Sequence, residues 1–187
     1  MKAIFFDRDG VINIDHGYTY KKEDFNFYDG VKEALSFFRR QGYALVLVTN
    51  QSGIARGMYT EDDFWELSEY MQDCLMDDFA AFDAIYFCPH LKGSKIKEYD
   101  VDCDCRKPKP GMFLQAQLDL NLDLEQSIMI GDHASDLIAA KSAGIKKLVL
   151  VGEHISSEKE KLNFDVIVKK DLQDCKLHFK EIEMIYE

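Results

Sequence analysis

The sequence contains little proline, little tryptophan and an unequal balance of charge. Three of its 187 residues are proline and one is tryptophan, and 23 lysine and arginine residues stand against 34 aspartate and glutamate residues, a net charge of -11. Because binding to a nucleic-acid backbone needs a basic surface, this balance disfavours nucleic acid as a partner. An acidic surface also repels anionic ligands, so a phosphate-binding site would have to concentrate positive charge locally.

Long apolar stretches, internal repeats and low-complexity segments are also missing from the sequence. The apolar run near Met1 is too short for a signal peptide or a membrane span, and no other stretch reaches about 18 apolar residues. We therefore expect a soluble cytoplasmic protein without a membrane partner. Hydrophobic residues make up 47% of the chain and charged residues 30%, which favours one compact domain over residues 1–187. We expect this domain to act as a monomer.

The five cysteines include three that crowd into one stretch, and this arrangement suggests metal ligation more than a set of disulfides. Cys88 and His90 are followed, after a spacer of twelve residues, by Cys103 and Cys105. Three thiolates and one imidazole suit a tetrahedral zinc ion, and four protein ligands predict a structural site with no position left for water. The alternative is a group of ordinary buried cysteines. Cys74, which has no partner at metal-ligand spacing, is expected to pack in the core.

Short apolar runs alternate with segments of helical periodicity along most of the chain. This alternation predicts an α/β fold, a Rossmann-like, doubly wound parallel sheet with helices on both faces. Ligands bind such sheets outside the carboxyl ends of the strands, so the residues that follow each strand are the first candidates for a site. We expect strands at 3–6, 43–48, 82–87, 127–130, 147–151 and 166–168, and helices at 31–41, after Thr60 with an apolar face that includes Met76, at 111–120, up to Ala143, and from Leu172.

Polar residues follow four of the predicted strands. Asp7 and Asp9 come after the first strand, Thr49 after the second, Cys88 after the third and Asp132 after the fourth. Since the carboxyl ends of parallel strands share one edge of the sheet, we expect these side chains to lie close together. Taken alone, the sequence Asp-Arg-Asp-Gly would fit an acidic turn equally well.

Taken together, these motifs resemble those of the haloacid dehalogenase superfamily of phosphatases, over roughly residues 1–151. The resemblance implies a phosphatase in which Asp7 attacks phosphorus and forms an acyl phosphate, while Asp9 protonates the leaving oxygen and later activates water. Thr49 and Lys107 would donate to the phosphoryl oxygens. A non-catalytic binding module with the same fold would need one of these groups to be missing. The four motifs occur in the superfamily's order: Asp7 with Asp9, Thr49, Lys107, and Asp132 with Asp136.

The resemblance also implies a magnesium ion, because two neighbouring carboxylates would otherwise repel a phosphate. Its ligands would be Asp7, Asp132 and a backbone carbonyl of Arg8 or Asp9. Asp136 lies one helical turn after Asp132 and would support the metal-bound waters or orient the lysine of the third motif. The alternative for Asp136 is an acid on the surface of a helix.

Within the superfamily, the zinc loop and the segment 7–13 resemble a small subgroup. It contains the D-glycero-D-manno-heptose 1,7-bisphosphate 7-phosphatases and the histidinol-phosphate phosphatases. The segments 15–18 and 49–57 and the long spacer of the zinc loop favour the heptose enzymes. The resemblance therefore implies removal of the 7-phosphate in nucleotide-activated heptose biosynthesis. A histidinol-phosphate phosphatase, or another small phosphate monoesterase, is the alternative.

The same resemblance implies a substrate site formed by loops, because no cap domain is inserted between the motifs. Arg56, Arg106 and Lys107 are more cationic groups than one metal-bound phosphate needs, which favours a bisphosphate, although Arg56 could instead lie on a solvated turn. At position 133 the heptose enzymes would lead us to expect lysine, but the chain has His133. The residues predicted to contact the substrate are Asp15, His16, Gly17, Tyr18, Asn50, Gln51, Ser52, Arg56, Arg106 and His133.

Overall fold

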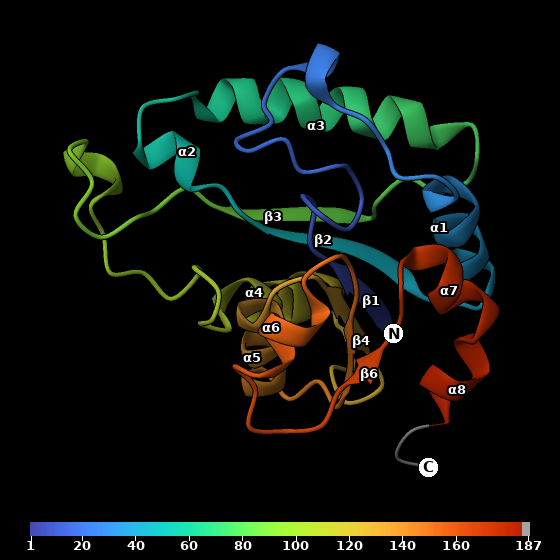
Figure 1. The fold of residues 1–187 in the computed structure, drawn as a ribbon. Coiled ribbons are helices and arrows are strands. Elements are labelled where there is room, and N and C mark those ends of the chain that lie inside the picture. The colour runs from blue at the N-terminus through green and yellow to red at the C-terminus, as the bar shows by residue number, and fades with distance from the viewer. Residues whose placement is uncertain (185–187) are drawn as a thin grey trace.

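The computed structural model describes residues 1–184 and contains a six-stranded parallel sheet (Figure 1). Its strands are β1 (Ala3–Phe6), β2 (Ala44–Asn50), β3 (Ala84–Cys88), β4 (Ile128–Gly131), β5 (Lys147–Leu150) and β6 (Ile167–Val168). Their order in the sheet is β3-β2-β1-β4-β5-β6, and every neighbouring pair is parallel. The predicted doubly wound fold is therefore confirmed.

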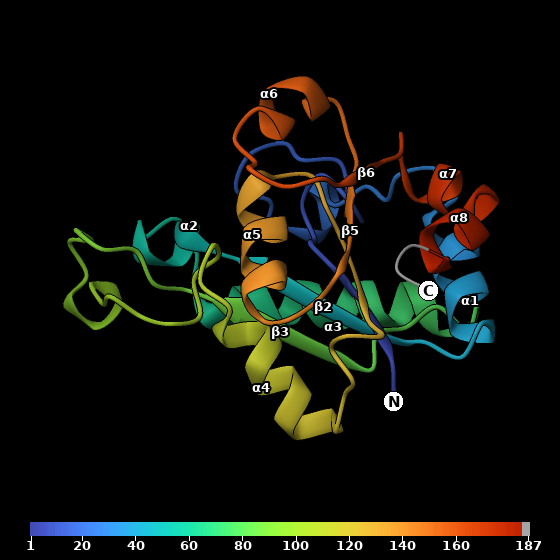
Figure 2. The same ribbon diagram turned by 90° about the horizontal axis from the view of Figure 1, so that it is seen from below.

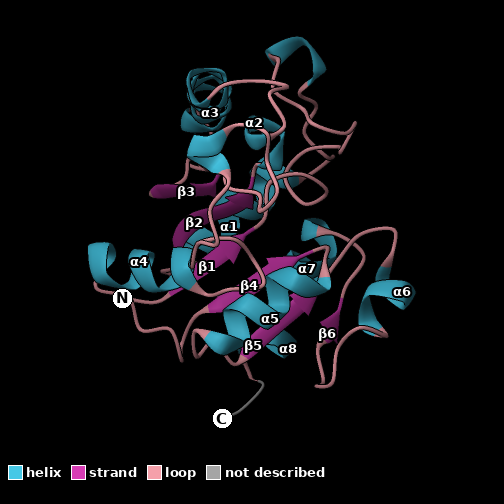
Figure 3. Ribbon diagram, turned by 90° about the vertical axis from the view of Figure 1, so that its left-hand side faces the viewer, coloured by secondary structure: helices cyan, strands magenta, loops and turns pink. Residues whose placement is uncertain are grey.

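Helices cover both faces of the sheet and give the molecule three layers, as Figures 1 and 3 show from two sides. Residues of α1, α3, α7 and α8 share one hydrophobic cluster with the sheet, and residues of α4 and α5 share the other. Ile155 of α6 packs against the second cluster. The helices are α1 (Val31–Arg40), α2 (Ser52–Ala55), α3 (Glu61–Met76), α4 (Gly111–Leu120), α5 (Ala134–Ser142), α6 (Ile155–Lys159), α7 (Leu172–Leu177) and α8 (Phe179–Glu183).

The central strand β1 is buried on both faces, which explains its unbroken apolar sequence. Ile4 and Phe6 point into the cluster that contains α1 and α3, whereas Ala3 and Phe5 point into the cluster that contains α4 and α5. Burying a phenylalanine side chain of this kind stabilises a fold by about 1.5–3 kcal/mol. The strand therefore fixes the position of the residue that follows it, Asp7.

The start of α3 agrees with the sequence, but its last turn differs. Thr60 caps the helix, with its hydroxyl accepting from the backbone N–H of Asp63 at 3.1 Å, while the Asp63 carboxylate accepts from the Thr60 N–H at 2.7 Å. Met76, which we predicted on the apolar face, is 62% exposed, because it lies about 100° around the helix from Leu75. Cys74 is only half-buried at the edge of that face, so its assignment to the core was wrong.

The topology creates a crevice at the carboxyl ends of β1 and β4. From β1 the sheet continues through β2 and β3 in one direction, and through β4, β5 and β6 in the other. In open α/β sheets such a reversal of strand order is where ligands bind. The strand β2 runs two residues further than predicted, so Thr49 and Asn50 belong to the sheet, and Asn50 pairs in register with Cys88 of β3.

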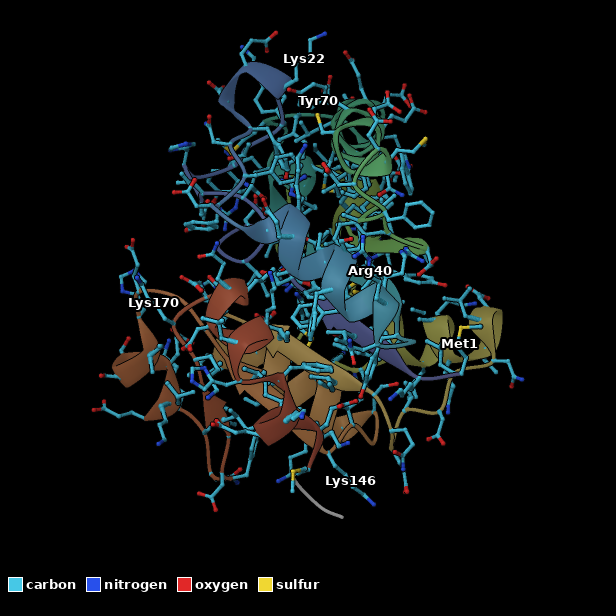
Figure 4. All side chains as sticks on the ribbon, turned by 90° about the vertical axis from the view of Figure 1, so that its right-hand side faces the viewer. Met1, Lys22, Arg40, Tyr70, Lys146 and Lys170 are labelled. Carbon is cyan, nitrogen blue, oxygen red and sulfur yellow. The ribbon has the colours of Figure 1, made fainter. Side chains whose placement is uncertain are left out.

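Two irregular segments lie near this crevice, residues 7–30 and 89–110. The first passes beside α3 before the chain enters α1, and its Phe25 ring lies 6.5 Å from the ring of Tyr70, which Figure 4 labels near Lys22. Each segment contains one 3₁₀ turn, at Lys22–Asp24 and Lys97–Tyr99. Within residues 1–184 neither segment forms a separate inserted domain.

The end of the described chain returns to the sheet and to α1. The helix predicted from Leu172 is divided at His178 into α7 and α8, which lie beside α1 in Figures 1 and 2. The rings of Phe179 and Phe38 are 5.2 Å apart, which joins the two helical regions. Across residues 1–184, none of the helices combines the length and the apolar character that a membrane crossing requires.

Candidate active site

Asp7 and Asp132 meet at the crevice because each follows a central strand. The N–H of Asp7 donates to the carbonyl of Ile130 at 3.3 Å, which continues the pairing of β1 with β4 beyond the strand end. Gly10 lies against Asp132 with a φ of +86°, and a Cβ atom there would stand 2.1 Å from an Asp132 carboxylate oxygen. Only glycine suits both the backbone and the close approach. The first and fourth motifs are thus packed directly together.

Lys107 is the cation at the centre of the site, and it is 3% exposed. Its ammonium donates to Asp7 at 2.9 Å, to Asp136 at 2.7 Å and to the carbonyl of Val48 at 2.8 Å. The Asn50 amide fixes the lysine backbone, accepting from its N–H at 3.0 Å and donating to its carbonyl at 3.1 Å. Asp136 is 2% exposed, so the alternative of a surface acid was wrong, and one of its carboxylate oxygens accepts from the lysine.

Three carboxylates lie close together in the site: Asp7 and Asp136, which are buried against Lys107, and Asp132, which is only half-buried. Burial raises the pKa of Asp7 to about 8, against the opposing effect of Lys107, and Asp136 and Asp132 raise it further. Burial also raises the pKa of Asp132. Burial lowers the pKa of Lys107, but Asp136 and Asp7 outweigh this effect, so the net shift is upward. Placing these carboxylates together therefore costs free energy unless a proton or a bound cation neutralises part of their charge.

A group of possible metal ligands lies at the same place. One ligand atom from each of Asp7, Asp132, His133 and Asp136 falls within 4.8 Å of all the others. Carboxylate oxygens are the ligands that magnesium prefers. The structure thus brings together the two carboxylates predicted to bind magnesium, Asp7 and Asp132.

Asp9 faces the same cavity but is held by a different set of donors. Arg8 donates to both oxygens of Asp9, at 3.0 and 3.1 Å. The Asn13 amide donates to one oxygen at 3.0 Å, and the Gln51 amide donates to the other at 3.2 Å. The sequence had not drawn attention to the side chain of Arg8, which is 1% exposed.

Thr49 is buried and connected to Asp9 through one side chain. The Gln51 amide donates to the Thr49 hydroxyl at 2.8 Å as well as to Asp9. The hydroxyl of Tyr59 donates in turn to the Gln51 carbonyl oxygen. Sequence reasoning had missed Tyr59, because a single aromatic residue in a loop carries no periodic signal. Its place is nevertheless fixed by Gly53, where a Cβ atom would stand 2.2 Å from the tyrosine ring.

A cavity of about 400 Å³ opens above these residues. Its lining includes seven of the ten residues predicted to contact the substrate: Asp15, Gly17, Tyr18, Asn50, Gln51, Ser52 and His133. The rest of the lining consists of the predicted catalytic residues Asp7, Asp9 and Lys107, of Asp136, and of Tyr59 and Ser135.

Three of the predicted substrate residues are not part of that lining. His16 is exposed, with its ring 3.4 Å from the amide of Asn26. The Arg56 guanidinium lies 6.0 Å from the ring of Tyr18, at the rim of the cavity. Arg106 points toward the cysteine loop, where it donates to the carbonyl of His90 at 3.5 Å.

His133 replaces the expected lysine and still supplies positive charge. A hydrogen bond between its ring and Asp132, 2.9 Å long, raises the pKa of His133 to about 9. Its backbone N–H donates to Asp136 at 3.1 Å, at the start of α5. The imidazole is half-exposed in the cavity. The hydrogen bond to Asp132 therefore favours the imidazolium form, which would provide a cation at this position as the expected lysine would.

The cysteine–histidine loop brings its four predicted ligands to one point. The ligand atoms of Cys88, His90, Cys103 and Cys105 all lie within 4.8 Å of one another. Neighbouring ligand atoms are separated by 2.8–3.7 Å, against about 3.8 Å between sulfurs that bind one tetrahedral zinc ion. The hydrogen bond from Cys88 lowers the pKa of Cys105 to about 5, so one thiolate is already favoured. The four groups therefore form one candidate metal site.

Comparison with known proteins identifies the family of the chain. A family model described as HAD-hydrolase-like matches residues 104–175. A D-glycero-beta-D-manno-heptose-1,7-bisphosphate 7-phosphatase of Vibrio cholerae is 51% identical over 162 residues, which cover 86% of this chain and 87% of that protein. A protein of the same name from Haemophilus ducreyi is 53% identical over 163 residues, covering 86% of this chain and 89% of the relative.

A solved structure agrees with the sequence comparisons. The crystal structure of D,D-heptose 1.7-bisphosphate phosphatase from B. bronchiseptica, complexed with magnesium and phosphate, superimposes with a TM-score of 0.84. The two sequences are 30% identical, and the match covers 97% of this chain and 99% of the other.

Proposed function

We propose that the chain removes the 7-phosphate of D-glycero-beta-D-manno-heptose 1,7-bisphosphate, because it belongs to the haloacid dehalogenase superfamily and, within it, to the D-glycero-beta-D-manno-heptose-1,7-bisphosphate 7-phosphatases. The chain is then a phosphoric monoester hydrolase. The observation that carries the proposal is the buried Lys107, which joins Asp7 to Asp136 at the floor of the cavity.

The chemistry proceeds in two steps on this arrangement. A carboxylate oxygen of Asp7 forms a bond to phosphorus, the bond from phosphorus to the sugar oxygen breaks, and Asp9 gives that oxygen a proton. In the second step Asp9 takes a proton from water, whose oxygen attacks phosphorus and frees Asp7. Thr49 and Lys107, fixed in place by Gln51 and Asn50, donate to the phosphoryl oxygens.

Magnesium fits the carboxylate group because Asp7 and Asp132 present carboxylate oxygens within 4.8 Å of each other. Asp7, Asp132 and the backbone carbonyl of Asp9 would hold it. The Arg8 carbonyl already accepts the N–H groups of Val11, Ile12 and Asn13, so of the two carbonyls considered that of Asp9 is the better ligand. The bound ion would shield the carboxylates from the phosphate and orient one phosphoryl oxygen.

Zinc fits the cysteine–histidine loop, with Cys88, His90, Cys103 and Cys105 filling all four positions. We infer a structural role for it. The loop continues directly into Arg106 and Lys107, so a metal ion would fix the approach of the catalytic lysine to the site.

The substrate lies in the cavity, in contact with the loop 15–18, with Asn50, Gln51 and Ser52, and with His133. Arg56 and Arg106 are outside the lining, and with His16 they would reach only a substrate group that extends past the rim. A bisphosphate has such a group at its second end. A monophosphate such as histidinol phosphate has no second phosphate that these residues could bind.

The wider setting follows from the same assignment. We propose one domain over residues 1–187, with the zinc loop at about 88–105, that acts as a monomer in the synthesis of nucleotide-activated heptose for lipopolysaccharide. None of the five cysteines forms a disulfide, which fits a reducing compartment such as the cytoplasm.

Phosphate release tests the proposed activity. The protein is incubated with magnesium and either anomer of D-glycero-D-manno-heptose 1,7-bisphosphate, or with histidinol phosphate, and the sugar product is identified by ³¹P and ¹H NMR. We expect heptose 1-phosphate as the product, and no release by Asp7→Asn. Preference for histidinol phosphate, or removal of the 1-phosphate, would overturn the assignment.

A further inference from the structure

Arg8 is a buried arginine that neither of the two chemical steps uses. Arginine is rarely buried unless it is paired, and this side chain follows Asp7 at the end of β1 with 1% of its surface exposed. The face of the Phe64 ring in α3 lies 5.9 Å from its guanidinium carbon. Such a costly group at the centre of a site calls for a specific role.

The contacts of Arg8 connect the catalytic acid to the substrate loop. Its Nη2 donates to both oxygens of Asp9, at 3.0 and 3.1 Å, and its Nε donates to one of them at 3.3 Å. The same Nη2 donates to the backbone carbonyl of Thr19 at 2.7 Å. Thr19 is buried and directly follows Gly17 and Tyr18, which line the cavity.

The donors around Asp9 hold both of its carboxylate oxygens, although part of the side chain faces the cavity. Arg8 engages both carboxylate oxygens, and Asn13 and Gln51 each engage one. The Asp9 side chain is nevertheless 23% exposed, and it belongs to the lining. Rotation of the carboxyl group would break at least two of these hydrogen bonds, so its direction is set by the guanidinium plane.

We propose that Arg8 is a positioning residue, which orients the Asp9 carboxyl group toward the leaving oxygen and couples this orientation to the position of the loop 15–19. The inference rests on the proposed function, in which Asp9 gives its proton to the sugar oxygen as the bond from phosphorus to that oxygen breaks. Misplacing a proton donor by about 1 Å can cost about 10²-fold in rate. Arg8 therefore acts on the first step, through Asp9, without touching the substrate.

The leaving group separates this role from a merely structural one. A sugar alkoxide needs a proton when it departs, whereas p-nitrophenolate departs without one. We compare kcat/KM, which reports the first step, for heptose 1,7-bisphosphate and p-nitrophenyl phosphate in the wild type, Arg8→Met and Arg8→Lys. Thermal unfolding of each variant shows whether it folds.

We expect Arg8→Met to lose about 10²-fold in kcat/KM on the heptose bisphosphate, the contribution of a general acid, and only a few-fold on p-nitrophenyl phosphate. Arg8→Lys keeps the charge but not the paired donors, so it should show the same difference between substrates to a smaller extent. Should the methionine variant not fold, the lysine variant decides alone. Equal losses on both substrates in a folded variant would overturn the proposal.

The matched control is Arg39→Lys, far from the site. Arg39 also donates to a carboxylate, Asp83 at 3.0 Å, and to backbone carbonyls, those of Phe79 and Ala81. The Arg39→Lys variant should leave the ratio of kcat/KM between the two substrates unchanged. The wild type by itself tests the proposed function: if it hydrolyses p-nitrophenyl phosphate but not the heptose bisphosphate, the substrate is wrong. The Arg8 comparison is then made with a simple alkyl phosphate, such as glycerol phosphate, as the poor leaving group.

Discussion

Lys107 illustrates, at the scale of a single residue, how the site balances its own charges. Its ammonium has three acceptors at 2.7–2.9 Å, and its side chain is 2% exposed. A buried ion pair contributes little net stability compared with apolar packing, but breaking one leaves an uncompensated charge. Lys107 therefore contributes both to the stability of the site and to its chemistry.

Replacing Lys107 with methionine should reduce both properties. We expect the free energy of unfolding to fall by about 3–5 kcal/mol, because Asp7 and Asp136 lose their common partner, and kcat to fall by about 10²–10³-fold with the loss of a fixed donor. Denaturant unfolding and phosphate release measure the two effects. The control is Lys109→Met, because Lys109 pairs with Asp102 on the surface. A Lys107→Met variant as active as the control would contradict the assignment.

Asp7 makes metal binding sensitive to pH. Burial raises the pKa of Asp7 from 3.8 to about 8. The metal-free folded protein therefore holds a proton that the unfolded chain would have released, and this contribution to stability declines as pH rises between those values. Magnesium must displace that proton, so its affinity should rise with pH up to about 8, by at most about tenfold per unit.

Calorimetric titration with magnesium at pH 6, 7 and 8.5, in buffers of different ionisation enthalpy, measures both the affinity and the proton release. Asp7→Asn cannot hold the proton and should lose most of the dependence. Equal magnesium affinity across this range in the wild type would show that Asp7 is already ionised before the metal binds.

Among the secondary-structure elements, α5 depends on a residue from the following helix. Glu158 of α6 is buried, and its carboxylate accepts from the N–H of Ala134, the first residue of α5, at 2.8 Å. Asp132 and His133 immediately precede α5, and Asp136 is inside it. The segment after β5 thus supports the fourth motif, a role that the sequence did not indicate.

Glu158→Ala should destabilise the protein by about 1–2 kcal/mol, the range for loss of a helix cap, and should weaken magnesium binding as the Asp132 loop loosens. Glu158→Gln retains an acceptor and should retain most of the stability. Glu160→Ala, two residues away on the exposed side, is the control for thermal unfolding and magnesium titration. Unchanged magnesium affinity in a destabilised Glu158→Ala would limit the residue to a structural role.

The loop that carries the four metal ligands is the second element with a separable role. We expect one zinc ion per chain by elemental analysis, retained during dialysis against a weak chelator. Cys105→Ser should lose the zinc and most of the activity, because Lys107 follows two residues later, whereas Cys74→Ser should keep both. Full activity in zinc-free Cys105→Ser would show that Asn50 alone is sufficient to hold Lys107.

For the molecule as a whole, the sequence predicted the sheet, the layers and the edge where the motifs meet. Periodicity and strand-end positions were sufficient for this, because β1 is apolar throughout and because Asp7 and Asp132 directly follow β1 and β4. The cysteine–histidine spacing was sufficient for the second cluster.

What the sequence did not reveal depends on contacts between distant segments. Arginine is usually exposed, so nothing in the pattern indicated that Arg8 is buried against Asp9 and Thr19. Tyr59 and Glu158 lie in short irregular or helical segments without periodicity. Their roles come from partners far away in the chain or in a neighbouring loop, which a pattern within one segment cannot specify.

The most direct test of the account is a single-turnover experiment with the protein in excess over heptose 1,7-bisphosphate labelled in its 7-phosphate. Acid quenching at short times, followed by peptide mapping, should find the label first on the peptide that contains Asp7 and later in free phosphate. Label that reaches phosphate without a protein-bound intermediate, or that appears on another residue, would contradict the central claim that Asp7 is the nucleophile.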